Sequence, residues 1–274
     1  MAHFADTHIH LHDKAFDADR NELISAFKES GIEFIVDIAA EKTSLEKVVA
    51  LTKEHDFIYG SLGFHPDEVG DFDEESEVYI RQNMCDAKIV AIGEIGLDYH
   101  WMTEPKDIQE KAFRKQSKMA KEAGLPIIVH SREAAEDTLR IIEEETDGIK
   151  EAIAKKRGIE KDEVTPGIIH CYSYATEQAR IYAKLGYMLG IGGVVTYKNG
   201  KKLKEVVGDI PLESLVLETD APYLAPDPFR GKRNDSRMIE YVINEIATLK
   251  NVSAEEVKNV TTINAKKVFY KIAQ

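Results

Sequence analysis

IVAIGEIGLDYHWMTEPKDIQEKAFRKQSKMAKEAGLPIIVHSR, residues 89–132, contains one complete strand–helix–strand unit. A short apolar run, Ile89–Ile92, leads through a polar loop to the amphipathic segment Lys106–Ala123, and a second apolar run follows at Ile127–Val129. Proline directly before the amphipathic segment and glycine directly after it are typical signals for the start and end of a helix. The stretch therefore predicts two parallel strands joined by a crossover helix.

The same pattern extends in both directions along the chain. Six more apolar runs occur, at Phe4–Asp6, Phe34–Ile38, Ile58–Leu62, Gly167–Ile169, Met188–Ile191 and Leu215–Leu217. Strand–helix alternation predicts a parallel sheet, either open and doubly wound or closed into a barrel. Eight repeats in 274 residues favour closure, because such a barrel typically needs ~250 residues. We therefore predict an α/β protein with a (β/α)8 TIM-barrel fold.

Segments with helical periodicity lie between the runs, and no low-complexity linker divides the chain, so we predict a single domain over residues 1–274. The predicted helices are Asn21–Ser30, Ser44–Glu54, Asp73–Met84, Glu133–Glu144, Glu177–Leu185 and Lys201–Val207, with Ser236–Leu249 and Ala254–Ile272 as closing helices. The charged segment Asp147–Glu163 is additional to the repeats, and we expect it to form a solvated surface insertion.

Composition excludes several classes of protein. The formal net charge of −13 argues against non-specific nucleic-acid binding through a basic surface, so a phosphate substrate would have to be held locally. Two cysteines make neither a disulfide framework nor a CxxC metal motif. The first residues do not resemble a signal peptide, and no apolar stretch is long enough for a membrane span. We expect a cytoplasmic protein without membrane contact, and the sequence indicates no obligate protein partner.

Potential metal ligands follow five of the predicted strands. In such barrels the site forms at the carboxyl ends of the strands, where the βα loops lie. The residues concerned are His8, His10, Glu94, His130, His170 and Asp220. Each has an ordinary alternative: an HxH pair arises by chance, a histidine or glutamate in a loop forms a hydrogen bond or an ion pair, and an aspartate before proline supports a turn.

Taken together, these six side chains favour a metal site. Carboxylates and imidazoles that converge without a cation at the mouth of a barrel would be costly to bury. Six ligands exceed what one tetrahedral ion uses, so we expect two divalent ions, with Glu94 as the shared carboxylate. Such a pair could hold a phosphoryl group during displacement or activate water against a carbonyl. The mixed ligand set is compatible with Zn, Mn or Mg.

The motifs resemble those of the TatD family of metal-dependent deoxyribonucleases, a branch of the amidohydrolase-like barrels. GEIGLDY (93–99) and ETDAPYLAP (218–226) are the most specific of them. The other matches are DTHIHL (6–11), GFHP (63–66), HSREA (130–134), HCYS (170–173), RGKRN (230–234), TTINA (261–265) and the residues Gln109, Phe113 and Gln116. Together they span residues 6–265, which is nearly the whole chain.

The resemblance implies a barrel with a metal pair that hydrolyses phosphodiester bonds, often as a 3′→5′ exonuclease on single-stranded DNA. It implies that one ion is bound by His8, His10, Glu94 and Asp220, and the other by Glu94, His130 and His170. His65, in GFHP, would contact the substrate phosphate or the leaving group, although it could be only a loop histidine braced by proline. We predict catalytic roles for Asp220, Glu94 and His65.

Two departures from the family pattern affect the rim of the site. Tyr174 stands where the family usually has glycine, so its ring could narrow the mouth, stack on a base or lie outward. Asp235 and Ser236 follow RGKRN, where the family commonly has an acid and proline, which leaves the rigidity of this loop open.

Further residues are candidates for binding the substrate. Arg132, Lys198 and Arg230 could hold flanking phosphates, although exposed basic residues are usually only solvated. Trp101 could stack on an unpaired base, although a loop tryptophan more often packs. We hypothesise that Asp220 orients the attacking water and accepts its proton together with the metal. The alternative reaction is hydrolysis of a small ester, a lactone or a C–N bond, because metal-pair barrels support many chemistries.

Overall fold

Eight parallel strands lie side by side in chain order within residues 3–272, which this computed structural model describes. The strands are β1 (Phe4–Ile9), β2 (Ile32–Ile38), β3 (Ile58–Leu62), β4 (Ile89–Asp98), β5 (Ile127–Arg132), β6 (Gly167–Ile169), β7 (Met188–Ile191) and β8 (Leu215–Leu217). Just beyond the end of β8, Ala221 pairs in parallel with Ile9 of β1. The sheet is therefore a nearly closed TIM-like barrel, which confirms the predicted fold class.

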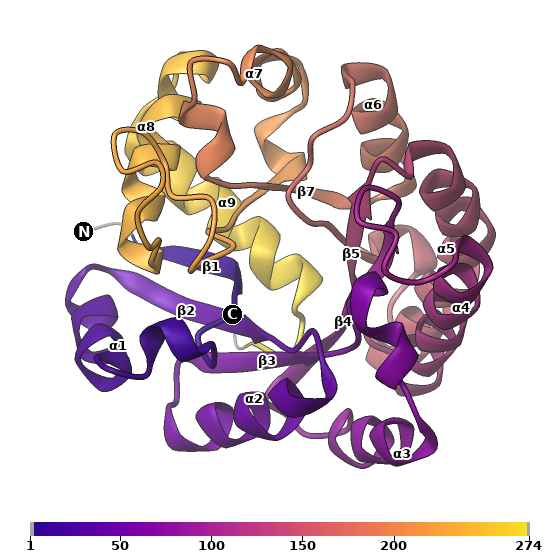
Figure 1. Cartoon of the computed structure of the whole chain (residues 1–274). Coiled ribbons are helices and arrows are strands. Elements are labelled where there is room, and N and C mark those ends of the chain that lie inside the picture. The colour runs from indigo at the N-terminus through magenta and orange to yellow at the C-terminus, as the bar shows by residue number, and fades with distance from the viewer. Residues whose placement is uncertain (1–2, 273–274) are drawn as a thin grey trace.

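Helices surround the strands, as Figure 1 shows in a view onto one end of the barrel. They are α1 (Arg20–Glu29), α2 (Lys42–Glu54), α3 (Glu74–Asn83), α4 (Lys106–Ala123), α5 (Ala135–Arg157), α6 (Thr176–Leu185), α7 (Lys201–Asp209), α8 (Ile239–Lys250) and α9 (Ala254–Val268). Helix α4 has the predicted limits, because it follows Pro105 and ends at Gly124 in the left-handed conformation, with φ 63°. No helix within residues 3–272 is long and apolar enough to cross a membrane.

Helix α5 is longer than predicted. It continues from Ala135 without a break to Arg157 and ends at Gly158, whose φ is 68°. Ile149 and Ile153 are buried and continue the apolar stripe of the helix, so this segment packs against the molecule. The charged residues occupy its outer face. Residues 147–157 are therefore the second half of a helix, and a short 3-10 turn at Lys161–Glu163 leads to β6.

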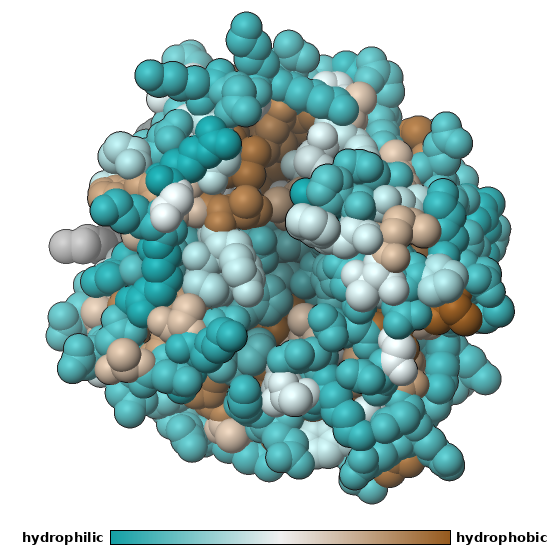
Figure 2. Space-filling view, viewed as in Figure 1, coloured by the Kyte–Doolittle hydropathy of each residue, from teal (hydrophilic) through white to brown (hydrophobic). Residues whose placement is uncertain are grey.

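The interior of the barrel is filled with apolar side chains, and helix α9 covers one end of it. Ala5, Phe34 and Ile168 belong to this inner cluster, together with Val268 and Phe269 from the end of α9. The apolar plug leaves the opposite end, at the carboxyl ends of the strands, as the place for polar chemistry. Figure 2 shows a central hollow on this face that is largely hydrophilic, with apolar residues along one edge.

Candidate metal centre

The six predicted ligands converge at the mouth of the barrel. A cavity of about 780 Å³ opens there, and its wall includes His10, Glu94, His130, His170 and Asp220. His8 is fully buried beside it. The structure therefore brings together side chains that are up to 212 positions apart (220 − 8) in the sequence.

A β-bulge turns His8 toward the inside of β1. Ala5 belongs to the inner apolar cluster and Ile9 to the outer one, although residues four apart on a regular strand share a face. The register shift between Asp6 and Ile9 explains the change, because a bulge inserts one extra residue and reverses the alternation that follows. His8 and His10 consequently point into the mouth, on the same face as each other.

Strand β4 uses the same device for Glu94. Ile92 and Ile95 both lie in the outer cluster although they are three residues apart, and the register of β4 against β5 shifts between them. Glu94 therefore faces inward, and so does Asp98 four residues later. His130 and His170 need no bulge, because each lies two residues beyond an inner residue of its own strand.

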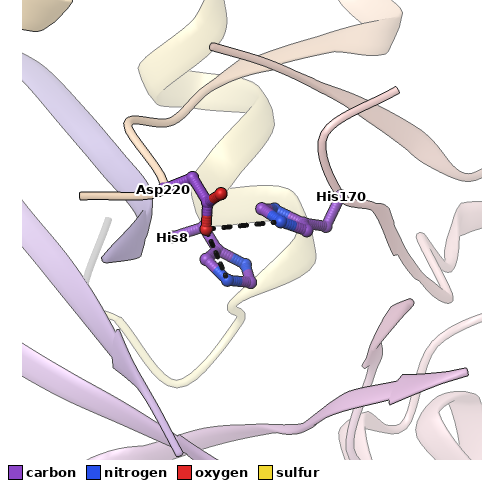
Figure 3. Close-up of side chains that lie close together, drawn as sticks. All are labelled: His8, His170 and Asp220. Carbon is purple, nitrogen blue, oxygen red and sulfur yellow. Dashed lines mark ion pairs between the residues drawn. The ribbon is translucent and has the colours of Figure 1, made fainter. Parts of the chain in front are cut away.

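Asp220 lies between three imidazoles. Its Oδ1 is 3.5 Å from His10 Nε2, 3.6 Å from His170 Nε2 and 3.8 Å from His8 Nε2. Figure 3 shows Asp220 above His8, with His170 approaching from the side. The His8 and His170 rings are stacked, with their centroids 3.5 Å apart. One carboxylate oxygen and three ring nitrogens thus enclose a small volume.

Glu94 presents its two oxygens to different histidines. Oε2 lies 3.4 Å from His8 Nε2 and 4.0 Å from His10 Nε2. Oε1 lies 2.8 Å from His130 Nδ1 and 3.7 Å from His170 Nε2. Ligand atoms of His8, His10 and Glu94 lie within 4.8 Å of one another, and so do those of Glu94, His130 and His170. The carboxylate therefore joins two neighbouring groups of ligands.

The carboxylates at the mouth raise the pKa values of three of the predicted ligand histidines. Burial lowers the pKa of His10, but the hydrogen-bonded carboxylate of Asp220 outweighs it, and the pKa rises to about 9. Burial also lowers the pKa of His130, but Asp98 and Glu94 outweigh it and raise the pKa to about 9. At His170, Glu218 and Glu94 outweigh burial in the same way, and its pKa also rises to about 9. Conversely, although burial opposes ionisation of Glu94, His170 and His8 hold its pKa well below the usual range.

These residues fit a bound cation. Burial, and then the neighbouring His170, lower the pKa of His8, so this imidazole is held neutral, as a metal ligand must be. Both ring nitrogens of His8 are buried without a hydrogen-bond partner, which is costly unless another group, such as a metal ion, binds them. Imidazole and carboxylate donors together suit divalent ions such as Zn or Mn. The arrangement can therefore hold divalent metal close to a substrate cavity.

The residues that orient these ligands were not identified from the sequence. His10 Nδ1 bonds to the carbonyl oxygen of Ile38 at 2.9 Å, and His170 Nδ1 lies 3.1 Å from Glu218 Oε2. His130 Nε2 is 3.1 Å from Asp98 Oδ2. Such partners fix the ring orientation of metal-binding histidines. The signal was available, because Asp98 and Glu218 lie four and two residues from predicted ligands.

His65 lies beside the ligands rather than among them. Its ring centroid is 4.2 Å from that of His130, and its Nδ1 accepts a hydrogen bond from the backbone of Asp67. Burial, and then the neighbouring His130, lower the pKa of His65 to about 3, so its ring is neutral. His65 lines the cavity, which is where a residue that contacts the substrate would have to be.

The predicted substrate-binding residues divide into two groups. Trp101 and Arg132 line the cavity, and the Arg132 guanidinium lies 5.4 Å from the centre of the Trp101 ring, which is 64% exposed. Among the described residues, Tyr174, Lys198 and Arg230 are not part of the cavity wall. Tyr174 instead bonds through its hydroxyl to Ser131 Oγ and to the backbone nitrogen of Ala134.

The loop after RGKRN is held firmly without the proline. Asn234 Nδ2 donates to the carbonyl oxygens of Thr219 and Tyr223, and Arg233 pairs with Asp19. Asp235 caps the following 3-10 turn by accepting from the backbone nitrogen of Arg237. The guanidinium of Arg233 is therefore occupied by contacts within the protein.

Comparisons with known proteins identify the family of the chain. Residues 5–270 match the family described as TatD related DNase. The metal-dependent hydrolase YabD of Bacillus subtilis, itself uncharacterized, is 42% identical over 264 residues, which cover 96% of this chain and 98% of that protein. The 3′-5′ ssDNA/RNA exonuclease TatD of a Rahnella strain is 28% identical over 267 residues, 95% of this chain and 96% of that protein.

Among solved structures, the TatD homologue YjjV of Escherichia coli K12 superposes with a TM-score of 0.85 at 28% sequence identity, and the match covers 98% of both chains. A TatD family hydrolase of Entamoeba histolytica shares the fold with a TM-score of 0.83. The chain therefore belongs to the TatD-related DNase family and is a metal-dependent hydrolase.

Proposed function

We propose that this hydrolase binds two divalent metal ions and cleaves phosphodiester bonds of single-stranded DNA from the 3′ end. The observation that carries the proposal is the placement of Glu94. Its Oε2 faces His8 and His10, whereas its Oε1 faces His130 and His170. A carboxylate with one oxygen in each of two ligand groups is suited to bridge a metal pair. His8, His10 and Asp220 would complete one site, and His130 and His170 the other.

The chain's own residues would supply the remaining chemistry. When bound, the metal pair would lower the pKa of a water molecule and offset charge at phosphorus. Asp220 would orient that water and accept its proton, since its Oδ1 lies within 3.8 Å of the Nε2 atoms of His8, His10 and His170. His65, neutral and on the cavity wall, would donate a hydrogen bond to the phosphate or the leaving oxygen.

A nucleic-acid substrate is supported by the family and by the wall of the cavity. The relative from Rahnella is named for its action on single-stranded DNA and RNA. Arg132 could hold the phosphate that precedes the scissile bond, and the exposed ring of Trp101 beside it could stack on that nucleotide's base. Roles for Lys198, Arg230 and Tyr174 remain predictions for a longer strand.

Digestion of end-labelled strands tests the proposal. The protein is stripped of metal, reloaded separately with Zn, Mn or Mg, and mixed with single-stranded oligonucleotides labelled at the 5′ or the 3′ end. We expect 5′-labelled strands to shorten progressively and 3′-labelled strands to release labelled mononucleotide. Chelator and the Glu94→Gln variant should both abolish this activity, because each removes the bridge.

A lactone and a cyclic amide assayed beside the oligonucleotides provide the alternative outcome. Metal-dependent turnover of either, without cleavage of any strand, would assign the protein to hydrolysis of small esters or C–N bonds and refute the proposal.

A further inference from the structure

A second aspartate–histidine pair lies at the mouth, next to the candidate ligands. His12 follows β1, lines the cavity and is 9% exposed, whereas Asp37, in β2, is completely buried. His12 Nδ1 lies 3.0 Å from Asp37 Oδ1. Neither residue is used by the proposed metal chemistry, and His12 is absent from the clusters of potential metal ligands within residues 3–272.

Asp37 determines which nitrogen of His12 carries the hydrogen. Its Oδ1 also accepts from the backbone nitrogen of Leu11, at 2.7 Å, so this oxygen acts as an acceptor. The His12 nitrogen that faces it, Nδ1, must therefore be the donor. In the neutral ring, Nε2 then carries a free lone pair. Within the described residues, the ring of His12 makes its hydrogen bond through Nδ1, and Nε2 is left for a group in the cavity.

His12 repeats the arrangement of the candidate ligand His10. The two rings are 5.9 Å apart, centroid to centroid, and nearly perpendicular. Neighbouring residues of β2 hold both rings through Nδ1: Ile38 holds His10 and Asp37 holds His12. Both rings are therefore fixed, and His12 lies next to the candidate ligand His10 on the cavity wall.

The surroundings of His12 exclude a second phosphate as its partner. The cavity wall on this side carries the carboxylates of Asp13, Glu41 and Glu68, from the loops after β1, β2 and β3. The pKa of Glu68 is raised by burial and then by the negative charge of Glu41. Arg132, a cation of the cavity wall, is instead the last residue of β5. An anionic group near His12 would be repelled, whereas a neutral hydroxyl would not.

We infer that His12 is a specificity residue that accepts a hydrogen bond from a sugar hydroxyl of the nucleotide bound at the metal centre. This inference rests on the proposed function and extends it. In a strand degraded from its 3′ end, the terminal nucleotide carries a hydroxyl and no further phosphate. The acidic side of the mouth would accommodate this end, while the rest of the strand, with its phosphates, leaves past Arg132.

Binding of nucleoside monophosphates tests the inference without turnover. The Mn-loaded protein is titrated calorimetrically with adenosine 5′-monophosphate and with its 2′-deoxy, 3′-deoxy and 2′,3′-dideoxy forms. We expect the dideoxy form to bind about tenfold more weakly than the full ribonucleotide, which is the effect of one neutral hydrogen bond. The two monodeoxy forms identify the hydroxyl: weaker binding of the 3′-deoxy form assigns the 3′-hydroxyl, and weaker binding of the 2′-deoxy form the 2′-hydroxyl.

Variants separate recognition from folding. His12→Ala should bind all the forms with affinities within about twofold of one another, and His12→Gln should keep part of the preference, since its amide oxygen can accept. His3→Ala is the control, because His3 is exposed, precedes β1 and is not part of the cavity wall, and it should behave as wild type. Thermal unfolding verifies that each variant is folded.

The possible failures are distinguishable. Equal affinity of the wild type for all the nucleotides, or an unchanged tenfold preference in folded His12→Ala, overturns the role of His12 and leaves the proposed function standing. If no nucleotide binds the metal-loaded protein and no strand is cleaved, the proposed function and this inference both fall.

Discussion

Asp220 occupies a backbone conformation that is uncommon for residues other than glycine. Its φ is 57°, in the left-handed region, directly after the end of β8. Such conformations cost free energy and persist where the surrounding structure enforces them, often at functional sites. Here the backbone nitrogen donates to the carbonyl oxygen of His8, at 2.9 Å, so the main chain is held while the side chain reaches the imidazoles.

Asp220→Asn should abolish turnover and leave a folded protein. The amide has the same shape but can neither accept a proton nor neutralise a metal ion, so we expect the rate on a single-stranded oligonucleotide to fall by about 10²–10⁴-fold. Steady-state rates at saturating metal, with circular dichroism to verify folding, measure this. Asp162→Asn, a carboxylate change at an exposed position outside the cavity wall, is the control. Near-normal activity of Asp220→Asn would contradict the assignment.

The raised pKa values of three histidines predict that metal binding releases protons. His10, His130 and His170 have pKa values of about 9 without metal, so they are protonated at neutral pH. A metal ion must displace those protons, and apparent affinity should weaken as pH falls from 9 to 6. Calorimetric titration with Zn or Mn at pH 7.5, in buffers that differ in ionisation enthalpy, measures the release. Binding without proton release would refute it.

The same pKa shifts predict that the stability of the protein without metal changes with pH in the direction opposite to its metal affinity. Each of these histidines has a pKa of about 9 when folded, compared with an ordinary value of 6.5. The folded state therefore binds more protons than the unfolded state between these values. Their stabilising contribution is complete below pH 6.5 and is lost as pH rises through 9, whereas metal-dependent stability increases over that interval.

Strands and helices differ in how well the sequence predicts them. Strands β3 and β8 have the predicted limits, because turn residues bound their apolar runs. Helix α4 also has the predicted limits, because Pro105 precedes it and Gly124 follows it. β4 extends six residues beyond the predicted Ile92, to Asp98. Its second half contains glycines and acidic residues that are unfavourable in strands, and pairing with β5 overrides this preference.

Convergence of the ligands was predictable, but their geometry was not. A parallel barrel brings every strand end to one mouth, so the ligand set followed from topology and spacing. The inward direction of His8 and Glu94 depends on two bulges, which strand periodicity does not indicate. Which of the two Glu94 oxygens faces which histidine could not be predicted either, because it depends on how β1, β4, β5 and β6 pack against one another.

Gly190 in β7 and Glu218 after β8 should act as one unit. A Cβ at Gly190 would overlap the Glu218 carboxylate, which lies across the strand and approaches His170 Nδ1 at 3.1 Å. Glu218→Gln should weaken metal binding or activity by about 10–100-fold, as changes to such orienting groups do. Gly190→Ala should cause a loss of similar size, because it displaces the same carboxylate.

The double variant distinguishes this coupling from two independent effects. If Gly190 acts through Glu218, combining the substitutions should add little to either alone. Gly208→Ala, at a glycine where an added Cβ meets nothing within 4 Å, is the control and should be neutral. Multiplicative losses in the double variant would show that the residues act separately.

The barrel closes between its first and last strands beside the candidate metal centre. Besides the bridge between Ile9 and Ala221, hydrogen bonds of Asp6 join β1 to the segments that follow β8. This buried carboxylate accepts from Thr219 Oγ1 and Ser236 Oγ, at 2.7 Å each. We call this junction between β1 and the end of β8 the seam. His8 and His10 lie on its β1 side, and Asp220 lies on its β8 side. A metal ion held by all three would link the first and last strands of the fold.

Metal should therefore stabilise the entire molecule, and the seam most of all. At a free metal concentration a hundred times Kd, binding to the folded state contributes about 2.7 kcal/mol. For a chain of this size that corresponds to a rise in Tm of roughly 5–10 °C. Calorimetric scans of the chelated and Mn-loaded protein measure the rise, and hydrogen exchange should show the largest gain in protection in β1 and in residues 218–221. His10→Ala should reduce both effects, and coincident melting curves with and without metal would show that the ion does not bridge the seam.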